Sequence, residues 1–154
     1  MTSNRYVIDA NVAMGAGKPT TPRALNCVRL LTRVVEGAHL CVFNEALLLE
    51  WSNHASVFAR GWLRQMHARK RYQLIEVAKH LALRKALLRA AMPEAERLGV
   101  EKDLHLLELA LAHDKLIVTL EVRLPNYLKG DKALAKFHSQ ITWIGDPETI
   151  PVTK

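Results

Sequence analysis

The feature of this sequence that most constrains its fold is an alternation of short, continuously apolar runs with longer segments of helical periodicity. The first run, at residues 5–9, contains Tyr6, Val7 and Ile8, which are aromatic or β-branched and show no polar alternation. Such a run is typical of a strand that is buried on both faces, as in a parallel sheet covered by helices. Strands separated by helical stretches therefore predict an α/β fold with a mainly parallel sheet and helices on both faces.

The expected elements follow from apolar periodicity and from capping and breaking residues. Strands are expected at residues 5–9, 40–43, 116–119 and 141–144. Helices are expected at residues 23–35, 44–66, 72–91 and 102–113, with another after residue 125. The helices of residues 44–66 and 72–91, joined by a bend at residues 70–71, would form a helical hairpin insertion.

Length and composition predict one domain over residues 1–154, because a hydrophobic content of 49% suffices for a single core. The sequence shows no run of membrane-spanning length and no basic-then-apolar leader, so we expect a cytoplasmic protein without a membrane partner. Cys27 and Cys41 lack metal-type spacing and are expected to be buried thiols. The net charge of +7 favours an anionic partner, with nucleic acid first and an acidic membrane surface second.

Acidic residues recur where expected strands end or where the following helices begin. They are Asp9, Glu50, Asp103 and Glu121. The carboxyl ends of parallel strands share one edge of a sheet, where open α/β folds bind ligands. Carboxylates that converge there cannot all ionise unless cations neutralise them, and Mg²⁺ or Mn²⁺ suits such oxygen ligands. An acidic metal pocket on a basic protein predicts an enzyme that cleaves phosphodiester bonds.

Simpler interpretations stay open for some of these acids. Glu50 could be a surface residue of its helix that pairs with Arg or His, and Asp103 could only cap the helix that follows it. On that helix the side facing water is expected to carry His105, Glu108 and Ala112.

The helix that carries Glu50 also holds an aromatic stripe. Trp51, Phe58 and Trp62 are expected to belong to the core and not to form a stacking platform. His54, on the same stripe, is expected to be a packed, hydrogen-bonded histidine and not a metal ligand.

The order and spacing of these residues resemble those of PIN-domain proteins. The segment Val7–Val12 is similar to the family's first strand with its Asp-any-Asn pattern, and Phe43–Glu50 is similar to its second strand and helix-borne Glu. Asp103–Leu111 resembles the third acid and its helix, and Thr119–Glu121 stands where the family has Thr or Ser, any residue, then Asp. The resemblance covers residues 5–145 and departs from the pattern at the last acid, where this chain has Glu.

The resemblance implies a three-layer α/β/α PIN-like domain and a metal-dependent endoribonuclease, often the toxin of a VapBC-type toxin–antitoxin pair. Carried over, Asp9, Glu50 and Asp103 would bind Mg²⁺ or Mn²⁺, and Glu121 would support a second ion, reaching it only through water. Asn11 would orient Asp9, and a supporting hydrogen bond would come from Thr119. The metal would activate water for in-line attack on an RNA phosphate, which leaves a 5′-phosphate and a 3′-hydroxyl.

The expected partners are RNA, an antitoxin protein and, for a homodimer, a second copy of the chain. The predicted helical hairpin carries the candidate RNA-binding residues Arg60, Arg64, Lys70 and Arg71, which could instead hold an acidic antitoxin tail or be a solvated surface. The alternative function is a non-catalytic PIN-fold module that binds RNA or another protein. Cleavage of single-stranded RNA that EDTA abolishes would distinguish the two.

Overall fold

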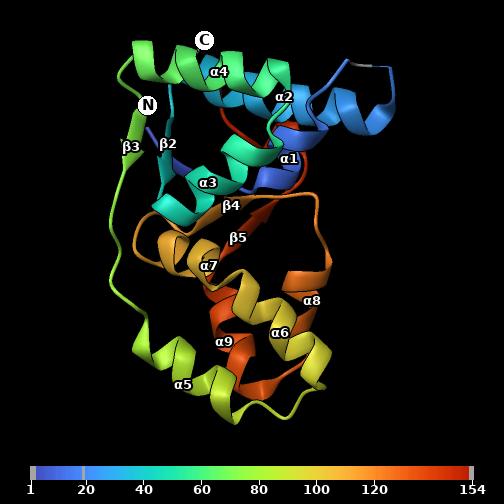
Figure 1. Cartoon of the computed structure of the whole chain (residues 1–154), viewed down its shortest axis with the longest axis vertical. Helices are drawn as coiled ribbons and strands as arrows, with labels where there is room; N and C mark the ends of the chain where they lie inside the picture. The colour runs from blue at the N-terminus through green and yellow to red at the C-terminus, as the bar shows by residue number, and fades with distance from the viewer. Residues whose placement is uncertain (1–2, 19, 153–154) are drawn as a thin grey trace.

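The fold is built around a parallel β-sheet, as the computed structural model of residues 3–18 and 20–152 shows (Figure 1). Within this part of the chain the sheet has five strands in the order β3-β2-β1-β4-β5, and every neighbouring pair is parallel. The strands are β1 (Arg5–Ile8), β2 (Leu40–Phe43), β3 (Tyr72–Leu74), β4 (Leu116–Val118) and β5 (Thr142–Ile144). The predicted α/β fold with a parallel central sheet is confirmed.

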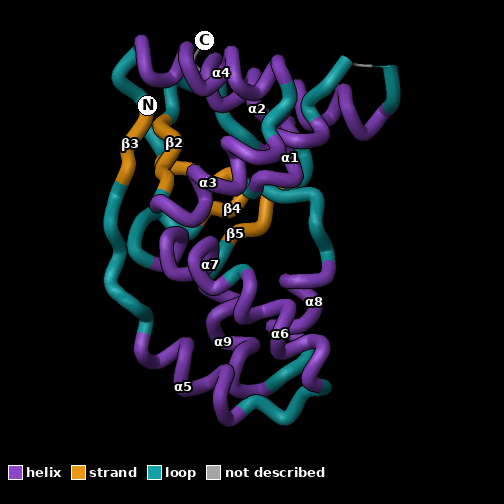
Figure 2. Tube along the Cα trace, viewed as in Figure 1, coloured by secondary structure: helices purple, strands orange, loops and turns teal. Residues whose placement is uncertain are grey.

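Helices cover the two faces of this sheet as separate layers (Figures 1 and 2). One layer contains α1 (Ala10–Gly15), α2 (Pro22–Glu36), α3 (Glu45–His54) and α4 (Val57–Ala68). The other contains α5 (Leu81–Arg89), α6 (Glu94–Lys102), α7 (Leu104–Leu111), α8 (Arg123–Lys129) and α9 (Lys132–Gln140). A short 3₁₀ turn, η1 (Pro147–Thr149), follows β5 and packs against α2. The chain moves along the sheet in one direction from β1 to β3 and in the other direction from β3 to β5. Right-handed crossovers in opposite directions place their helices on opposite faces of the sheet, which accounts for the two layers.

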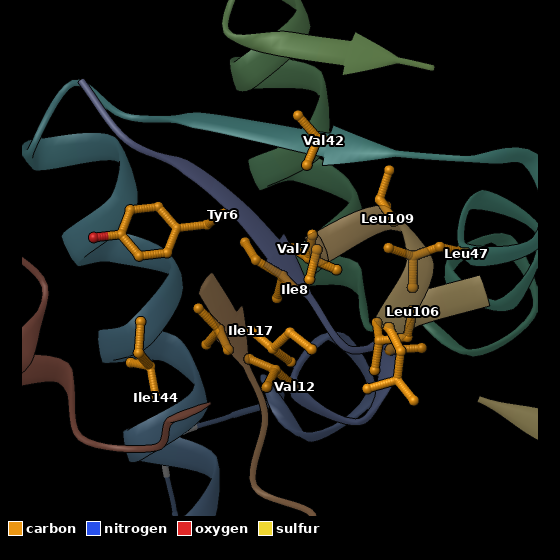
Figure 3. Close-up of a cluster of buried hydrophobic side chains, with 14 of the residues drawn as sticks. Tyr6, Val7, Ile8, Val12, Val42, Leu47, Leu106, Leu109, Ile117 and Ile144 are labelled. Atoms are coloured by element: carbon orange, nitrogen blue, oxygen red, sulfur yellow. The ribbon is translucent and has the colours of Figure 1, made fainter. Parts of the chain in front are cut away.

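The central strand β1 lies in the middle of the core. Tyr6, Val7 and Ile8 are at most 1% exposed, because both faces of the strand are covered by helices. Figure 3 shows these side chains among apolar neighbours that include Val42 of β2 and Ile117 of β4. The absence of polar alternation in β1 is therefore explained by burial on both sides.

The helix expected at residues 44–66 is two helices, α3 and α4. Ala55 has an extended backbone, and the hydroxyl of Ser56 caps α4 by accepting a hydrogen bond from the N–H of Ala59 at 3.1 Å. The same hydroxyl donates to the carbonyl of Ala16 at 2.6 Å. Ala55 thus ends α3, and Ser56 starts α4 while it ties the junction to the end of α1.

The second helix of the predicted hairpin is wrong over its first part. Residues 72–74 form β3, which pairs with β2 so that Cys41 lies opposite Tyr72, and helix α5 begins only at Leu81. This pairing satisfies the backbone groups on the outer side of β2, which would have no strand partner if residues 72–74 were helical. The structure also adds α6, which the sequence analysis did not predict, before the expected helix at residues 102–113.

Burial separates the side chains that were expected in the core. Cys27 and Cys41 are free, fully buried thiols, as predicted. Trp51 is buried as predicted, whereas Phe58 is 40% exposed, so its assignment to the core was wrong. His54 is exposed, so it is not the packed histidine that was expected. None of the helices in the described part of the chain combines the length and the apolar character that a membrane crossing requires.

Candidate functional site

The candidate site lies where the connections of two neighbouring strands diverge to opposite layers. The chain enters α1 after β1 and enters α8 after β4, so a crevice opens at the carboxyl ends of these strands. Asp9 directly follows β1, and its N–H donates to the carbonyl of Val118 at 2.9 Å. Thr119 directly follows β4. The sheet therefore holds these two residues side by side at the switch point.

The hydroxyl of Thr119 is the centre of a small hydrogen-bond network. It donates to Oδ2 of Asp9 at 3.0 Å and accepts from the side-chain amide of Asn11 at 3.1 Å and from the N–H of Glu121 at 3.0 Å. Thr119 is 7% exposed, and its backbone N–H is bonded to β5 through the carbonyl of Ile144. The backbone N–H of Asn11 donates to Oδ1 of Asp9 at 3.4 Å. The side chain of Asn11 is linked to the same carboxylate indirectly, through the hydroxyl of Thr119.

A cavity of about 330 Å³ opens beside this network. Its described lining residues are Asp9, Ala10, Asn11, Met14, Glu50, His54, Lys102, Asp103 and Glu121. The cavity therefore brings together all four of the acids that the sequence analysis singled out. Asp9 and Glu50 come from the α1–α4 side of the sheet. Asp103 comes from the α5–α9 side, and Glu121 comes from the loop after β4.

The environment of Asp9 disfavours its ionised form. Burial raises the pKa of the Asp9 carboxyl, and the hydrogen bonds from Thr119 and Asn11 oppose this rise. The nearby carboxylates of Glu50 and Glu121 raise the Asp9 pKa further. The net result is a pKa above the ordinary value, which is what a carboxylate among carboxylates should show.

Asp103 lies between α6 and α7 and faces the same cavity. Its side chain makes no capping hydrogen bond to α7, so the capping interpretation is wrong. Burial raises the pKa of Asp103 to about 6, with further contributions from the charges of Asp9 and Glu50, which exceed the opposing effects of His105 and Lys102.

Glu50 projects from α3 toward the first turn of α7. Its Oε1 lies 3.0 Å from Nε2 of His105, but the ring N–H is not aligned with the carboxylate, and this buried nitrogen has no well-directed acceptor among the described residues. Burial lowers the pKa of His105, but Glu50 and Asp103 together outweigh burial and raise it. Glu50 therefore lines the cavity and also pairs with a histidine, which combines the two interpretations that the sequence left open.

Of the residues expected on the water-facing side of α7, Glu108 is buried and His105 is partly buried instead. The side chain of His105 is 17% exposed, and Glu108 is 7% exposed. Glu108 is buried because Arg84 of α5 binds both carboxylate oxygens, with N–O distances of 3.0 and 2.7 Å. Ala112, the third residue of that set, is exposed as expected.

Glu121 turns back toward its own loop. Its Oε1 accepts a hydrogen bond from the backbone N–H of Arg123 at 2.9 Å and lies 3.8 Å from Nε of the same residue. With a side chain that is 40% exposed, Glu121 is the least enclosed of the paired acids at this cavity.

The donor chemistry of the cavity suits a hard divalent cation, because carboxylate oxygens are the ligands that Mg²⁺ and Mn²⁺ prefer. A preformed coordination shell is not seen: within residues 3–18 and 20–152, no three His, Cys, Asp or Glu side chains are grouped closely enough to hold one ion. The carboxylates of Glu50 and Glu121 are instead engaged by His105 and Arg123. The site thus offers suitable ligands that would have to move together to coordinate a metal.

The four candidate RNA-binding residues separate into two pairs. Arg60 and Arg64 lie on α4 and line a second cavity next to α3. Lys70 and Arg71 directly precede β3, which places them at the amino ends of the strands, on the sheet edge opposite to Asp9. The guanidinium of Arg71 donates to the carbonyl of Ala38 at that edge.

Two nitrogen-bearing side chains that were not predicted to belong to the site also line the carboxylate cavity. Lys102 is the last residue of α6 and directly precedes Asp103, so adjacency to an acidic candidate was the available signal. His54 lies one helical turn after Glu50, on the same side of α3. Both add nitrogen groups to a cavity otherwise dominated by carboxylates.

Neither a scan against models of known protein families nor a search of curated proteins finds a match to this chain.

Proposed function

We propose that this protein is a metal-dependent ribonuclease that hydrolyses phosphodiester bonds of RNA, as its resemblance to PIN-domain proteins implies. The observation that supports this most is the pairing of Asp9 and Asp103 across one cavity at the switch point, where burial and the charge of Asp9 raise the pKa of Asp103. Mutually repelling carboxylates at a ligand-binding edge gain most from a bound cation.

Asp9, Asp103 and Glu50 would hold Mg²⁺ or Mn²⁺, which would supply charge neutralisation and the activation of water at neutral pH. Thr119 would fix the Asp9 carboxylate through its 3.0 Å hydrogen bond. Lys102, at the rim of the same cavity, would attract the phosphate of the substrate, because a cation offsets the repulsion between the carboxylates and a polyanion. The net charge of +7 would favour RNA binding overall.

A toxin role within a toxin–antitoxin pair belongs to the same proposal. Its test is growth arrest on expression, relieved by the product of the adjacent gene and absent with Asp9→Asn.

The second candidate is a non-catalytic module that binds RNA or another protein. What favours it is the engagement of Glu50 by His105 and of Glu121 by Arg123, which leaves the carboxylates without a preformed metal shell.

The deciding experiment compares purified wild type, Asp9→Asn and Glu121→Gln on a panel of labelled single-stranded RNAs with Mn²⁺ and with EDTA. Wild type is expected to cleave with Mn²⁺ and to stop with EDTA. Asp9→Asn keeps the side-chain shape but removes the central charge, so cleavage should fall below detection while the melting curve stays intact. Glu121→Gln should be milder, because this carboxylate is turned toward Arg123.

Cleavage by Asp9→Asn at the wild-type rate would contradict the catalytic assignment. A wild type that binds RNA but cleaves no member of the panel would favour the non-catalytic module.

A further inference from the structure

A second cavity of about 590 Å³ lies between α3 and α4. Its described lining residues are Trp51, Ser52, Ala55, Arg60, Leu63, Arg64 and His67. None of these is acidic, and two carry a permanent positive charge, so this cavity is opposite in character to the carboxylate cavity. Its volume is in the range of sites that hold small organic ligands.

The two cavities share α3 as a common wall. Glu50 and His54 line the carboxylate cavity, whereas Trp51 and Ala55, each one position further along the helix, line the second. The indole N–H of Trp51 donates to the carbonyl of Ile8 at 2.9 Å, directly before Asp9 in the chain. A strand whose phosphate lies at the carboxylates would therefore reach the second cavity by crossing one helix.

The cationic side of the second cavity is provided by α4. Nε of Arg60 donates to the carbonyl of Ala55 at 3.1 Å, which holds the guanidinium in place while engaging one of its five N–H donors. Arg64 lies one turn further along the same face of α4 and is exposed. One more turn along, His67 is fixed by stacking on Tyr72, with ring centroids 3.9 Å apart.

Planar cationic groups beside an apolar floor are typical of sites for single-stranded nucleic acid, where bases stack while the backbone is held by charge. Here Leu63 and the 1% exposed Trp51 line the apolar part, Arg60 and Arg64 supply planar cationic groups, and His67 supplies a planar ring. An acidic peptide would use the charges but not the apolar floor, nor the position of this cavity one helix away from the carboxylate cavity.

We propose that the cavity between α3 and α4 binds a nucleotide of the RNA strand that flanks the phosphate in the carboxylate cavity. This assignment rests on the proposed function, because it takes the occupant of the carboxylate cavity to be RNA. It also excludes Lys70 from this RNA path, since that residue lies at the opposite edge of the sheet.

The test measures binding of a fluorescent single-stranded RNA by anisotropy in EDTA, so that cleavage cannot interfere. Arg64→Ala is compared with Arg89→Ala, which removes the same charge from an exposed position on α5 in the other helical layer. We expect Arg64→Ala to raise the Kd about tenfold, as for loss of a stacked base, and to flatten the dependence on salt by about 0.7 log–log units per lost phosphate contact. Arg89→Ala and Lys70→Ala should change neither quantity.

A second variant, Arg60→Ala, should weaken binding in the same direction, and melting curves establish that each variant is folded. Equal losses in Arg64→Ala and Arg89→Ala would reduce the effect to overall charge and overturn the proposal. Absence of any RNA binding by wild type would overturn it too.

Competition with a polyglutamate peptide separates the two classes of partner. If the peptide binds as tightly as RNA and depends on Arg64 to the same extent, the cavity is a site for acidic peptides and the nucleotide assignment is wrong. Weak competition supports the nucleotide assignment.

Cleavage measured separately with Mn²⁺ distinguishes this proposal from the ribonuclease proposal. If wild type cleaves, Arg64→Ala should raise KM and leave kcat nearly unchanged. If wild type binds RNA without cleaving it, and Arg64→Ala but not Arg89→Ala weakens this binding, the nucleotide site stands and the catalytic proposal fails. If wild type cleaves and Arg64→Ala changes neither KM nor RNA affinity, the nucleotide site is wrong and the catalytic proposal stands.

Discussion

At the scale of single residues, the carboxylate cavity is organised by a hydroxyl. Thr119 donates to Asp9 and accepts from Asn11 and from the backbone of Glu121, so one side chain fixes the groups that follow β1 and β4. Because all three bonds meet at a residue that is 7% exposed, rotation of the Asp9 carboxylate would break a buried hydrogen bond. Asp103 lines the same cavity, but unlike the side chain of Asp9 its side chain caps no helix.

The prediction at this scale concerns Asp103. Its pKa rises from 3.8 to about 6 on folding, so the ionised side chain destabilises the metal-free protein above pH 6, and this penalty disappears below pH 3.8. Asp103→Asn should therefore raise the free energy of unfolding by roughly 1–2 kcal/mol at neutral pH, and the gain should decline as the pH falls through the folded pKa. Urea titrations in EDTA at several pH values measure this.

The matched control for that prediction is Asp146→Asn. Asp146 is exposed and accepts a hydrogen bond from the N–H of Glu148 at 3.0 Å, so its neutralisation should bring no gain at neutral pH. If Asp103→Asn behaves like Asp146→Asn, the carboxylate cavity is not electrostatically strained.

At the scale of elements, an ion pair between the buried carboxylate of Glu108 and the partly exposed Arg84 connects α5 to α7. Glu108 of α7 accepts from Arg84 and from the backbone N–H of His80, the residue that also caps α5 by accepting from the N–H of Leu83 at 3.1 Å. Burial raises the pKa of Glu108, but Arg84 and the His80 N–H outweigh burial and lower it. This pairing fixes α7, which begins beside Asp103, against the start of α5.

The element-scale prediction is an asymmetry between the two partners of this pair. Arg84→Ala should lower the free energy of unfolding by about 2–3 kcal/mol, because it leaves a buried carboxylate without its cation. Glu108→Gln should cost less, since the amide oxygen can still accept from His80 and the Arg84 side chain is 36% exposed. Chemical denaturation at neutral pH gives both values.

A surface pair provides the control for this asymmetry. The side chains of Arg29 and Glu148 form an ion pair and are 50% and 61% exposed. Arg29→Ala breaks this pair and should lower the free energy of unfolding by about 1 kcal/mol or less. A loss in Arg84→Ala no larger than this would mean that the Glu108 pair does not stabilise the fold.

At the scale of the whole molecule, the carboxylate cavity joins the two helical layers. Asp9 and Glu50 belong to the segments on the α1–α4 side, and Asp103 belongs to the junction of α6 and α7 on the other. A cation bound between them would stabilise the whole fold and not one element alone.

The prediction at this scale is a rise in Tm when Mn²⁺ is added to the metal-free protein. A ligand at 100 times its Kd stabilises the native state by about 2.7 kcal/mol, which corresponds to several degrees for a chain of this size. Asp9→Asn should lose most of the rise, and an equivalent ionic strength of KCl should produce none. No shift at millimolar Mn²⁺, or the same shift in Asp9→Asn, would contradict the metal site.

The sequence by itself determined the parallel α/β fold and the meeting of the four acids. Continuous apolar runs such as Tyr6–Ile8 and Leu40–Phe43 are typical of strands covered on both faces in a parallel sheet, and residues that follow such strands, such as Asp9, then lie at one edge together with the helices that start there. The caps were equally local signals, as with Asn44, whose side chain accepts from the N–H of Leu47 at 2.9 Å at the start of α3.

Only the tertiary structure decided features that depend on a partner far along the chain. Residues 72–74 form a strand because β2 offers an open edge, and Glu108 is buried because Arg84 lies 24 positions away in sequence but in direct contact. Likewise, Arg60 and Arg64 line the cavity beside α3, whereas Lys70 and Arg71 lie at the opposite edge of the sheet. This separation arises because residues 72–74 join the sheet as β3. A segment of three residues such as β3 is too short to show either the helical or the strand period, so the choice between them depends on the neighbouring strand that completes the hydrogen bonds.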